Sequence, residues 1–359
     1  MEQPGTRGKL DWPLMLAILG LSALGLAMVN SATRETPGLE DALARQAIYL
    51  LVGLLLCTFL AWSDYRLLVG VSPIIYALGL AALLVVDIIG STIHGGQRWL
   101  AIGGFTLQPS EFMKVALALL LAHYLNGRAD ESWRFSHLLG SGAIVLLPAL
   151  LVYAQPDLGT TVMLFALWLF AVFVGGARTW HLLLLVAVAL AGAPVIWNRL
   201  EPYMRERVLS FLWPGSNPEA SYVVRQALIS IGSGGLWGKG YLGGSQTQLH
   251  FLRVRHTDFI FSVIGEELGF AGCAVVVALF CFVTWRLLAI AQRASDAAGR
   301  VIAATAAMAI ALQAFVNISM NLGWLPVTGL PLPFVSVGGS ALIAQFLFVG
   351  LAQSVRLRS

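Results

Sequence analysis

An aspartate stands where a polar, basic loop runs into a long apolar segment of this 359-residue chain. Asp258 lies just behind four basic or polar residues, namely Arg253, Arg255, His256 and Thr257. A carboxylate at the mouth of a membrane helix is costly unless it is paired or hydrated, so such an acid is a candidate functional residue. The alternative is that Thr257 or Asp258 caps the helix by accepting hydrogen bonds from its free N–H groups. This local pattern leaves both interpretations open.

A second group of charges opens another apolar segment. Glu111 and Lys114 are three residues apart, a spacing that puts both side chains on one face of a helix. Charges inside a membrane need partners, so the pair is expected to form an ion pair that holds helices together. The functional alternative is that the pair faces a cavity and positions an anion or a base. Both interpretations are compatible with each other.

A glycine-rich series runs from Ile231 to Gly240 and has Lys239 near its end. Many flexible N–H donors beside one cation could cradle a phosphate group. The series lacks the Gly-Lys-Ser/Thr ending of a P-loop, so alone it is a weak indication of phosphate binding.

Two further acids receive different interpretations. Asp157 follows Pro156 and opens an apolar run, which is typical of a residue that caps a helix N-terminus. Glu266 lies two helical turns beyond Asp258, about 80° around the helix, and could line the same cavity, whereas Glu267 faces the opposite side.

The elements that must position these residues are membrane helices. Hydrophobic residues make up 58% of the chain and charged residues 11%, and apolar runs recur from end to end. We therefore expect an all-α polytopic membrane protein that forms a single domain over residues 1–359, because each span takes about 20 residues. The three cysteines lie within apolar runs and indicate core positions. The expected spans are 12–31, 43–62, 67–90, 109–126, 137–154, 158–175, 180–198, 258–285, 300–322 and 337–355.

Basic residues in short loops predict the orientation of these spans. One set of loops and both chain ends carry Arg7, Lys9, Arg66, Arg128, Arg134, Arg178, Arg286, Arg293, Arg300, Arg356 and Arg358. Both termini are therefore expected in the cytoplasm, with the first apolar segment retained as a helix. The long loop 199–257, between the seventh and eighth spans, is then extracytoplasmic, as are the polar motifs above.

Two segments near this outer face have unusual patterns. Residues 201–212 can form a short amphipathic helix, either on the membrane surface or packed against the bundle. Residues 329–340 are rich in glycine and proline and predict a broken backbone, which at membrane depth requires protein or a water-filled cavity around it. A cavity between the helices is therefore expected.

Taken together, the motifs resemble the SEDS family of bacterial cell-wall polymerases, and its elongation-type branch more than its division-type branch. The matching segments occur in the family's order along nearly the whole chain: 96–100, 108–112 with Lys114, 155–160, 231–236 with 238–240, 256–261 with 266–269, and 326–334. Two positions depart from the family pattern. Arg253 replaces a proline, and Val337 replaces a tyrosine, which puts the local loop shape and one hydrogen bond in question.

The resemblance implies a peptidoglycan glycosyltransferase that polymerises lipid II at the outer face of the cytoplasmic membrane. It implies that Asp258 is the general base for the acceptor hydroxyl and that the lipid diphosphate leaves with inversion at the donor sugar. The residues expected to bind substrate are Arg98, Glu111, Lys114, Arg205, Arg207, Lys239, Arg255, His256 and Thr257. His256 and Asp258 alone are too few ligands to predict a metal site, although a divalent cation, Mg²⁺ or Mn²⁺, could share the stabilisation of the diphosphate.

The resemblance also implies partners: a class B penicillin-binding protein with transpeptidase activity, lipid II and the nascent glycan, and other membrane proteins of an elongation complex. No nucleic-acid partner is expected. Two alternatives remain at this point. A lipid flippase would use the same charges as a substrate path, and a scaffold would only recruit the transpeptidase. The clustering of polar motifs on the predicted outer face favours the enzyme.

Overall fold

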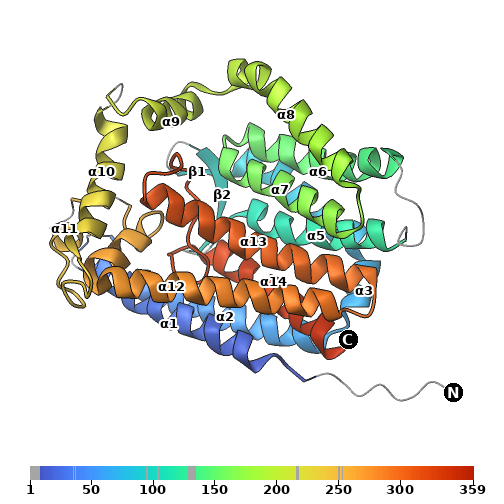
Figure 1. Cartoon of the computed structure of the whole chain (residues 1–359), viewed down its shortest axis with the longest axis horizontal. Coiled ribbons are helices and arrows are strands. Elements are labelled where there is room, and N and C mark those ends of the chain that lie inside the picture. The colour runs from blue at the N-terminus through green and yellow to red at the C-terminus, as the bar shows by residue number, and fades with distance from the viewer. Residues whose placement is uncertain are drawn as a thin grey trace.

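The computed structural model describes residues 9–34, 36, 38–93, 96–102, 105–127, 135–215, 218–249, 251–252 and 254–359. Arg7, Arg128, Arg134 and Arg253 lie outside these residues. The described chain forms a bundle of helices with one small sheet (Figure 1). Its helices are α1 Trp12–Thr33, α2 Ala42–Trp62, α3 Tyr65–Gly70, α4 Ser72–Ile89, α5 Pro109–Asn126, α6 Phe135–Ala154, α7 Leu158–Val174, α8 Thr179–Arg199, α9 Pro202–Leu212, α10 Pro218–Ser233, α11 Ser245–Gln248, α12 Ile260–Arg293, α13 Ala297–Asn321 and α14 Gly339–Leu357.

The prediction of a helical membrane protein is confirmed. Each apolar segment expected to span the membrane contains a helix, although Val71 separates α3 from α4 in the third one. Within the described residues, seven helices are long and apolar enough to cross a bilayer: α1, α2, α4, α6, α12, α13 and α14. Large apolar side chains, such as Leu16, Leu55 and Ile88, are exposed on their outer faces. Such exposure suits contact with lipid tails rather than with water.

The expectation of an all-α chain missed a three-stranded antiparallel sheet between α4 and α5. Its strands are β1 Ser91–Ile93, β2 Gly96–Ile102 and β3 Phe105–Leu107. Leu100 pairs with Leu107, and Ala101 pairs with Thr106. The backbone N–H and C=O groups of this segment are not in a helix, so they would need water or side chains as partners. In the sheet they bond to one another instead.

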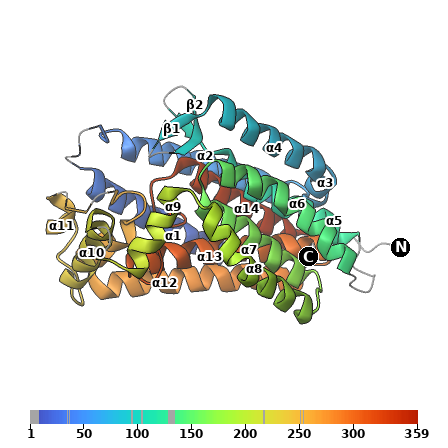
Figure 2. The ribbon, with the colours of Figure 1, turned by 90° about the horizontal axis from the view of Figure 1, so that it is seen from above.

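The long segment between α8 and α12 is also more structured than the expected loop. The predicted amphipathic helix forms as α9, and α10 and α11 follow it. Together α8, α9 and α10 cross over one side of the bundle, with α10 standing beside one end of α12 (Figures 1 and 2). Within this segment, α10 packs against α12.

The buried centre of the bundle is α13, which packs against α5, α7, α12 and α14. Small residues allow this close packing, because helices without large side chains at their contacts can approach one another closely. The buried small residues of α13 include Gly299, Ala303, Ala304, Ala306, Ala307 and Ala314. Side chains on α13 can consequently reach several other helices at once.

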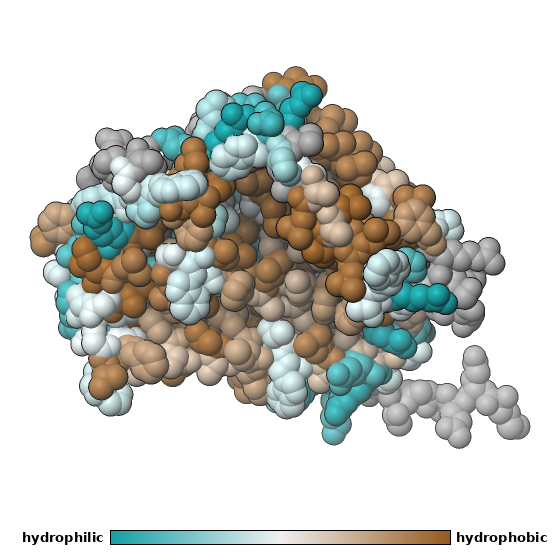
Figure 3. All heavy atoms as spheres, turned by 45° about the horizontal axis from the view of Figure 1, so that its top comes forward, coloured by the Kyte–Doolittle hydropathy of each residue, from teal (hydrophilic) through white to brown (hydrophobic). Residues whose placement is uncertain are grey.

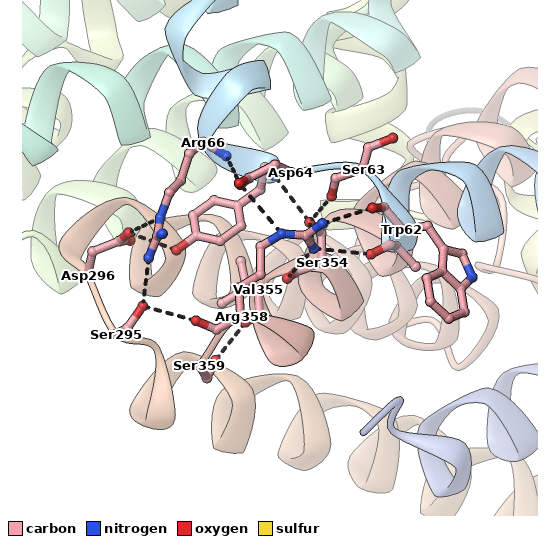
Figure 4. A network of polar contacts seen from close by, with 12 residues as sticks. Trp62, Ser63, Asp64, Arg66, Ser295, Asp296, Ser354, Val355, Arg358 and Ser359 are labelled. Atoms are coloured by element: carbon pink, nitrogen blue, oxygen red, sulfur yellow. Dashed lines mark hydrogen bonds and ion pairs between the residues drawn. The ribbon is translucent and has the colours of Figure 1, made fainter. Parts of the chain in front are cut away.

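The start of α1 and the end of α14 meet at one end of the bundle, which we call the termini end. The Asp11 N–H donates to Gln353 Oε1 over 3.0 Å, and Arg286 forms an ion pair with Asp11 at 2.6 Å. A second polar network joins Asp64, Arg66, Asp296, Ser354 and Arg358 at the same end (Figure 4). The first and last helices therefore have their terminal ends on the same side, as the predicted orientation requires.

Candidate functional site

A cavity of about 420 Å³ lies at the opposite end of the bundle, which we call the cavity end. It is bordered by the N-terminal parts of α2, α5, α7 and α14, and by the segments that precede α12 and α14. Of the residues predicted to form the site, those that line it are Arg98, Glu111, Arg207, His256, Thr257 and Asp258. The structure thus brings together residues that are up to 160 positions apart in the chain.

Asp258 does not cap α12. Phe259 occupies the cap position, and its side chain forms no capping hydrogen bond with the start of the helix. The Asp258 carbonyl instead accepts hydrogen bonds from Asn317 Nδ2 at 3.1 Å and from Asn321 Nδ2 at 2.9 Å. Because these bonds use the main chain, the Asp258 side chain lines the cavity with its backbone fixed from behind. The functional interpretation of this acid is therefore favoured over capping.

A second cavity, of about 440 Å³, shares Arg207, Val254 and Asp258 with the first. Its other walls come from α9, α10 and residues 323–327 and are mostly apolar. The surface that α8, α9 and α10 cross is hollowed, and most residues around the hollow are hydrophobic (Figure 3). Asp258 and Arg207 thus border both cavities.

Arg207 is held at this boundary by the segment that precedes α14. Its Nη1 donates to the Val327 carbonyl over 3.1 Å. Gly329 lies alongside with φ +76°, a backbone conformation that favours glycine. The guanidinium and the carboxylate of Asp258 therefore face the same glycine.

Arg98 is anchored to the turn before α7. Its Nε donates to the Gln155 carbonyl over 2.9 Å, its Nη2 contacts the Pro156 carbonyl, and its Nη1 lies 3.9 Å from Asp157 Oδ1. The prediction that Asp157 caps a helix is confirmed, since its Oδ1 accepts from the Thr160 N–H over 3.0 Å. Arg98 thus reaches from β2 to the turn before α7 and lines the cavity there.

The Glu111–Lys114 ion pair forms inside the bundle. Lys114 Nζ lies 2.8 Å from Glu111 Oε2, and the two side chains are 0% and 2% exposed. Lys114 also donates to Gln313 Oε1 on α13 over 3.0 Å. Glu111 lines the cavity, whereas Lys114 is not among the lining residues and links α5 to α13 through Gln313.

The segment before α14 also supports the loop that carries His256 and Thr257. The Val337 N–H donates to the His256 carbonyl over 2.9 Å, and Ser336 Oγ donates to the Thr257 carbonyl over 2.5 Å. Val337, which departs from the family pattern, lines the cavity itself. The main-chain support of this loop is therefore present without the tyrosine.

Two predicted substrate-binding arginines do not line either cavity. Arg255 is 6% exposed, and it donates to the Ala32 carbonyl and to Thr36 Oγ1, both over 2.7 Å. Arg205 donates to the Asn198 carbonyl over 2.7 Å. Burial lowers the pKa of the Arg255 guanidinium, although an arginine remains protonated at neutral pH. Arg255 thus ties the segment before α12 to the end of α1, and Arg205 ties α9 to the end of α8.

Lys239 also lies away from both cavities. Its Nζ forms an ion pair with Glu266 Oε1 at 2.8 Å, and Glu266 is 0% exposed. Glu266 accepts further hydrogen bonds from the N–H groups of Gln246 and Thr247. The expectation that Glu266 lines the cavity is therefore wrong, because its carboxylate is bonded to residues of the segment between α10 and α12.

The glycine-rich series forms main-chain hydrogen bonds with α12 at a break in that helix. Gly269 has φ +66° and interrupts the helix, so the N–H groups of Phe270 and Ala271 bond to the carbonyls of Gly235 and Leu236, at 2.9 and 3.0 Å. The carbonyls of Glu266 and Glu267 accept in turn from the N–H groups of residues 239 and 240, both at 3.0 Å. We call this four-bond exchange the backbone splice. These N–H groups are occupied, so the structure does not support the phosphate-cradle hypothesis for them.

Some residues of the site were not anticipated. Arg45, Gln46 and Tyr49 of α2 line the cavity. Polar residues at the start of an apolar helix are the feature of the sequence that could have indicated their place in the site. The amides of α13 were also missed, although Gln313, Asn317 and Asn321 recur every four residues within an apolar helix.

The cavity combines cations and acids. Arg45, Arg98 and Arg207 line it together with Glu111 and Asp258. Guanidinium groups present planar, two-pronged donors that suit phosphate oxygens, and a carboxylate can accept a proton. Within the described ranges, no group of three or more His, Cys, Asp or Glu residues is placed to hold a metal ion. The arrangement can bind an anionic group beside a potential base.

These features define an integral membrane protein with an arginine-lined, acid-containing cavity at one end of a helical bundle. The chain belongs to the FtsW/RodA/SpoVE family of cell cycle proteins, whose model matches residues 12–359. The family expected from the motifs is thereby confirmed.

Similar proteins cover nearly the whole chain. The peptidoglycan glycosyltransferase MrdB of Escherichia coli (strain K12) is 39% identical over 353 residues, which are 96% of this chain and 93% of the relative. The probable peptidoglycan glycosyltransferase FtsW of Nitrosococcus halophilus is 38% identical over 372 residues, covering 99% and 94%. A chain of a structure described as "Structural coordination of polymerization and crosslinking by a peptidoglycan synthase complex" superimposes with a TM-score of 0.84 at 33% identity, covering 97% of both chains. The rod shape determining protein RodA of Thermus thermophilus gives a TM-score of 0.72 at 30% identity, covering 97% and 96%.

Proposed function

We propose that this chain is a peptidoglycan glycosyltransferase that joins lipid II units into glycan strands during cell elongation. One observation carries the proposal: Asp258 does not cap its helix and lines a cavity with three arginines, Arg45, Arg98 and Arg207. The names of the relatives as peptidoglycan glycosyltransferases support the same activity. The elongation branch is supported by the similarity to RodA.

In this proposal Asp258 acts as the general base. Its carboxylate takes the proton from the 4-hydroxyl of the acceptor sugar while that oxygen attacks the anomeric carbon of the donor. The bond between that carbon and the diphosphate oxygen breaks, and the α-linked donor becomes a β-1,4 linkage. A positioned base typically contributes about 10² to 10⁴ in rate.

The leaving diphosphate needs the remaining stabilisation. Arg45, Arg98 and Arg207 are proposed to donate hydrogen bonds to its oxygens as negative charge develops there. His256 and Asp258 share the cavity and are too few to hold a cation alone. Together with the diphosphate oxygens they would hold an Mg²⁺ or Mn²⁺ ion, which would help to neutralise the charge of the leaving diphosphate, since Mg²⁺ commonly binds through one or two protein groups plus phosphates.

The partners and location extend the proposal. A class B penicillin-binding protein is proposed as the partner, because a similar solved chain belongs to a peptidoglycan synthase complex. The cavity end is proposed to face outward from the cytoplasmic membrane, with the termini end inside. This orientation rests on the basic residues of the short loops.

The test is polymerisation of lipid II by the purified chain with its transpeptidase partner. We expect glycan polymer from the wild type, none from Asp258→Asn, and wild-type amounts from Asp64→Asn, a matched change at the termini end. Equal polymer from Asp258→Asn and wild type would remove Asp258 as the base. No polymer from any of the three would contradict the glycosyltransferase, and lipid II movement across vesicles would then favour a flippase.

A further inference from the structure

Three buried amides of α13 form a row that points toward the site. Gln313, Asn317 and Asn321 are each 0% exposed. Residues four apart in a helix are offset by only about 40° around its axis, so all three lie along one stripe. Buried amides are costly unless they are hydrogen-bonded, which makes their partners informative. We call this row the amide ladder.

The amide ladder forms hydrogen bonds to the two segments that border the cavity, the one before α12 and the one before α14. Asn317 Nδ2 donates to the Leu330 carbonyl over 2.8 Å as well as to the Asp258 carbonyl. Gln313 Nε2 donates to the Pro331 carbonyl over 2.9 Å. Since Asp258, Leu330 and Pro331 all line the cavity, one helix fixes two of its walls relative to each other.

Asn321 has a second task at the start of α12. Its Oδ1 accepts from the Ser262 N–H at 3.1 Å and from Ser262 Oγ at 2.7 Å. The first N–H groups of a helix lack partners within the helix, and a side chain normally supplies one. The Ser262 N–H is shared with the Phe259 carbonyl, also at 3.1 Å. Asn321 thus provides from α13 the capping oxygen that Thr257 and Asp258 do not provide.

We propose that Asn317 and Asn321 are positioning residues for the reaction. This inference rests on the proposed role of Asp258 as the base. The two amides fix the Asp258 carbonyl from the rear, and Asn321 also takes over the capping of α12. The Asp258 side chain lines the cavity, and its position there is set by hydrogen bonds from the helix α13 to its main chain as well as by the loop 254–258. A misplacement of about 1 Å at a reacting group can cost about 10²-fold in rate.

The test uses leucine substitutions, which nearly keep the shape of asparagine and remove its hydrogen bonds. For Asn317→Leu and for Asn321→Leu, in the complex with the transpeptidase partner, we expect kcat for lipid II polymerisation to fall about 10- to 100-fold. KM should stay within about two-fold, because the arginines proposed to hold the diphosphate are untouched. If Asn321→Leu does not fold, Asn317→Leu tests the same carbonyl with the capping of α12 intact.

Gln353→Leu is the matched control. Gln353 is also 0% exposed and bonds to the main chain of Asp11, with Nε2 donating to its carbonyl over 3.1 Å, but at the termini end. We expect it to lower the thermal midpoint comparably and to leave kcat unchanged. Equal losses of kcat in Gln353→Leu and the ladder variants, or a parallel rise in KM, would show a merely structural role and overturn the inference.

The outcomes separate this inference from the function on which it rests. Failure of the wild type to polymerise lipid II contradicts the function, and full activity of Asp258→Asn contradicts the base. If wild type is active and Asp258→Asn is not, a kcat within about two-fold of wild type in both ladder variants overturns the positioning role alone.

Discussion

Arg207 Nη1 and Asp258 Oδ2 lie equally far, at 3.8 Å, from the point that a Cβ on Gly329 would occupy. The base and one cation of the site therefore border the same small space, and a backbone without a side chain keeps it open. Gly329 is also in the left-handed region, where other residues are strained.

Gly329→Ala should consequently lower both stability and activity. The left-handed conformation costs a non-glycine residue about 1 to 2 kcal/mol. The added methyl group would occupy the space between carboxylate and guanidinium, and we expect polymerisation to fall about ten-fold or more. Thermal unfolding and lipid II turnover measure the two effects. Wild-type turnover in a destabilised Gly329→Ala protein would show that substrate does not use this space.

The Glu111–Lys114 pair predicts a separation of stability from activity. Lys114→Met leaves a buried carboxylate without its cation and should cost about 3 to 5 kcal/mol in the free energy of unfolding. The double variant Glu111→Gln, Lys114→Met should recover most of that stability, because no uncompensated charge remains. Its polymerisation should remain low if Glu111 acts in the cavity. Recovery of both stability and turnover would assign the pair a structural role only.

The backbone splice can be tested with two glycines that share a conformation. A Cβ on Gly238 would lie 2.1 Å from the Glu267 carbonyl oxygen, whereas a Cβ on Gly240 meets nothing within 4 Å; both residues have positive φ. Gly240→Ala should therefore cost only the strain of about 1 to 2 kcal/mol. Gly238→Ala should cost clearly more and make the segment 235–249 sensitive to proteases. Equal destabilisation by the two changes would contradict the close contact with α12.

Asp296, at the termini end, predicts a pH dependence of stability (Figure 4). Burial alone would raise the pKa of this carboxyl, but hydrogen bonds from the Gly299 N–H, the Tyr65 hydroxyl and Arg66 outweigh it and lower the pKa below its ordinary value of 3.8. A lowered folded-state pKa stabilises the protein above the unfolded-state value, and this contribution is lost as pH falls through the folded-state pKa.

Asp296→Asn should therefore have a lower thermal midpoint than wild type at neutral pH. The difference corresponds to about 1 kcal/mol or less, because the group is partly exposed. It should shrink as pH falls below the ordinary value of 3.8. Midpoints of both proteins measured from pH about 7 to about 3 check this, and a constant difference across that range would exclude the carboxylate as its source.

The membrane helices and the central acid could be predicted from sequence because their signals are local. Apolar runs require helices in a bilayer, and a charge beside such a run demands an explanation within a few residues. Asp157 was predicted as a cap for the same reason, since the oxygen and the N–H that it binds are only three residues apart.

The directions of the loop side chains could not be predicted in this way. Arg205, Lys239 and Arg255 carry the right charge for a diphosphate, but their partners lie on other elements of the fold. The splice requires two segments separated by about thirty residues to meet in one register, and the sequence shows only that one of them is rich in glycine. The periodicity of hydrophobic residues describes only local windows of the sequence, so it does not predict long-range pairing of this kind.

The splice also divides α12 mechanically. A continuous helix resists bending through its own hydrogen bonds, and a helix whose bonds are diverted bends at that point. Main-chain bonds tie the segment 235–240 to both parts of α12: to the part that follows Asp258 through the carbonyls of Glu266 and Glu267, and to the part after Gly269 through the N–H groups of Phe270 and Ala271. A displacement of the segment 235–240 would thus change the bend between the two parts of α12, and with it the position of the Asp258 end.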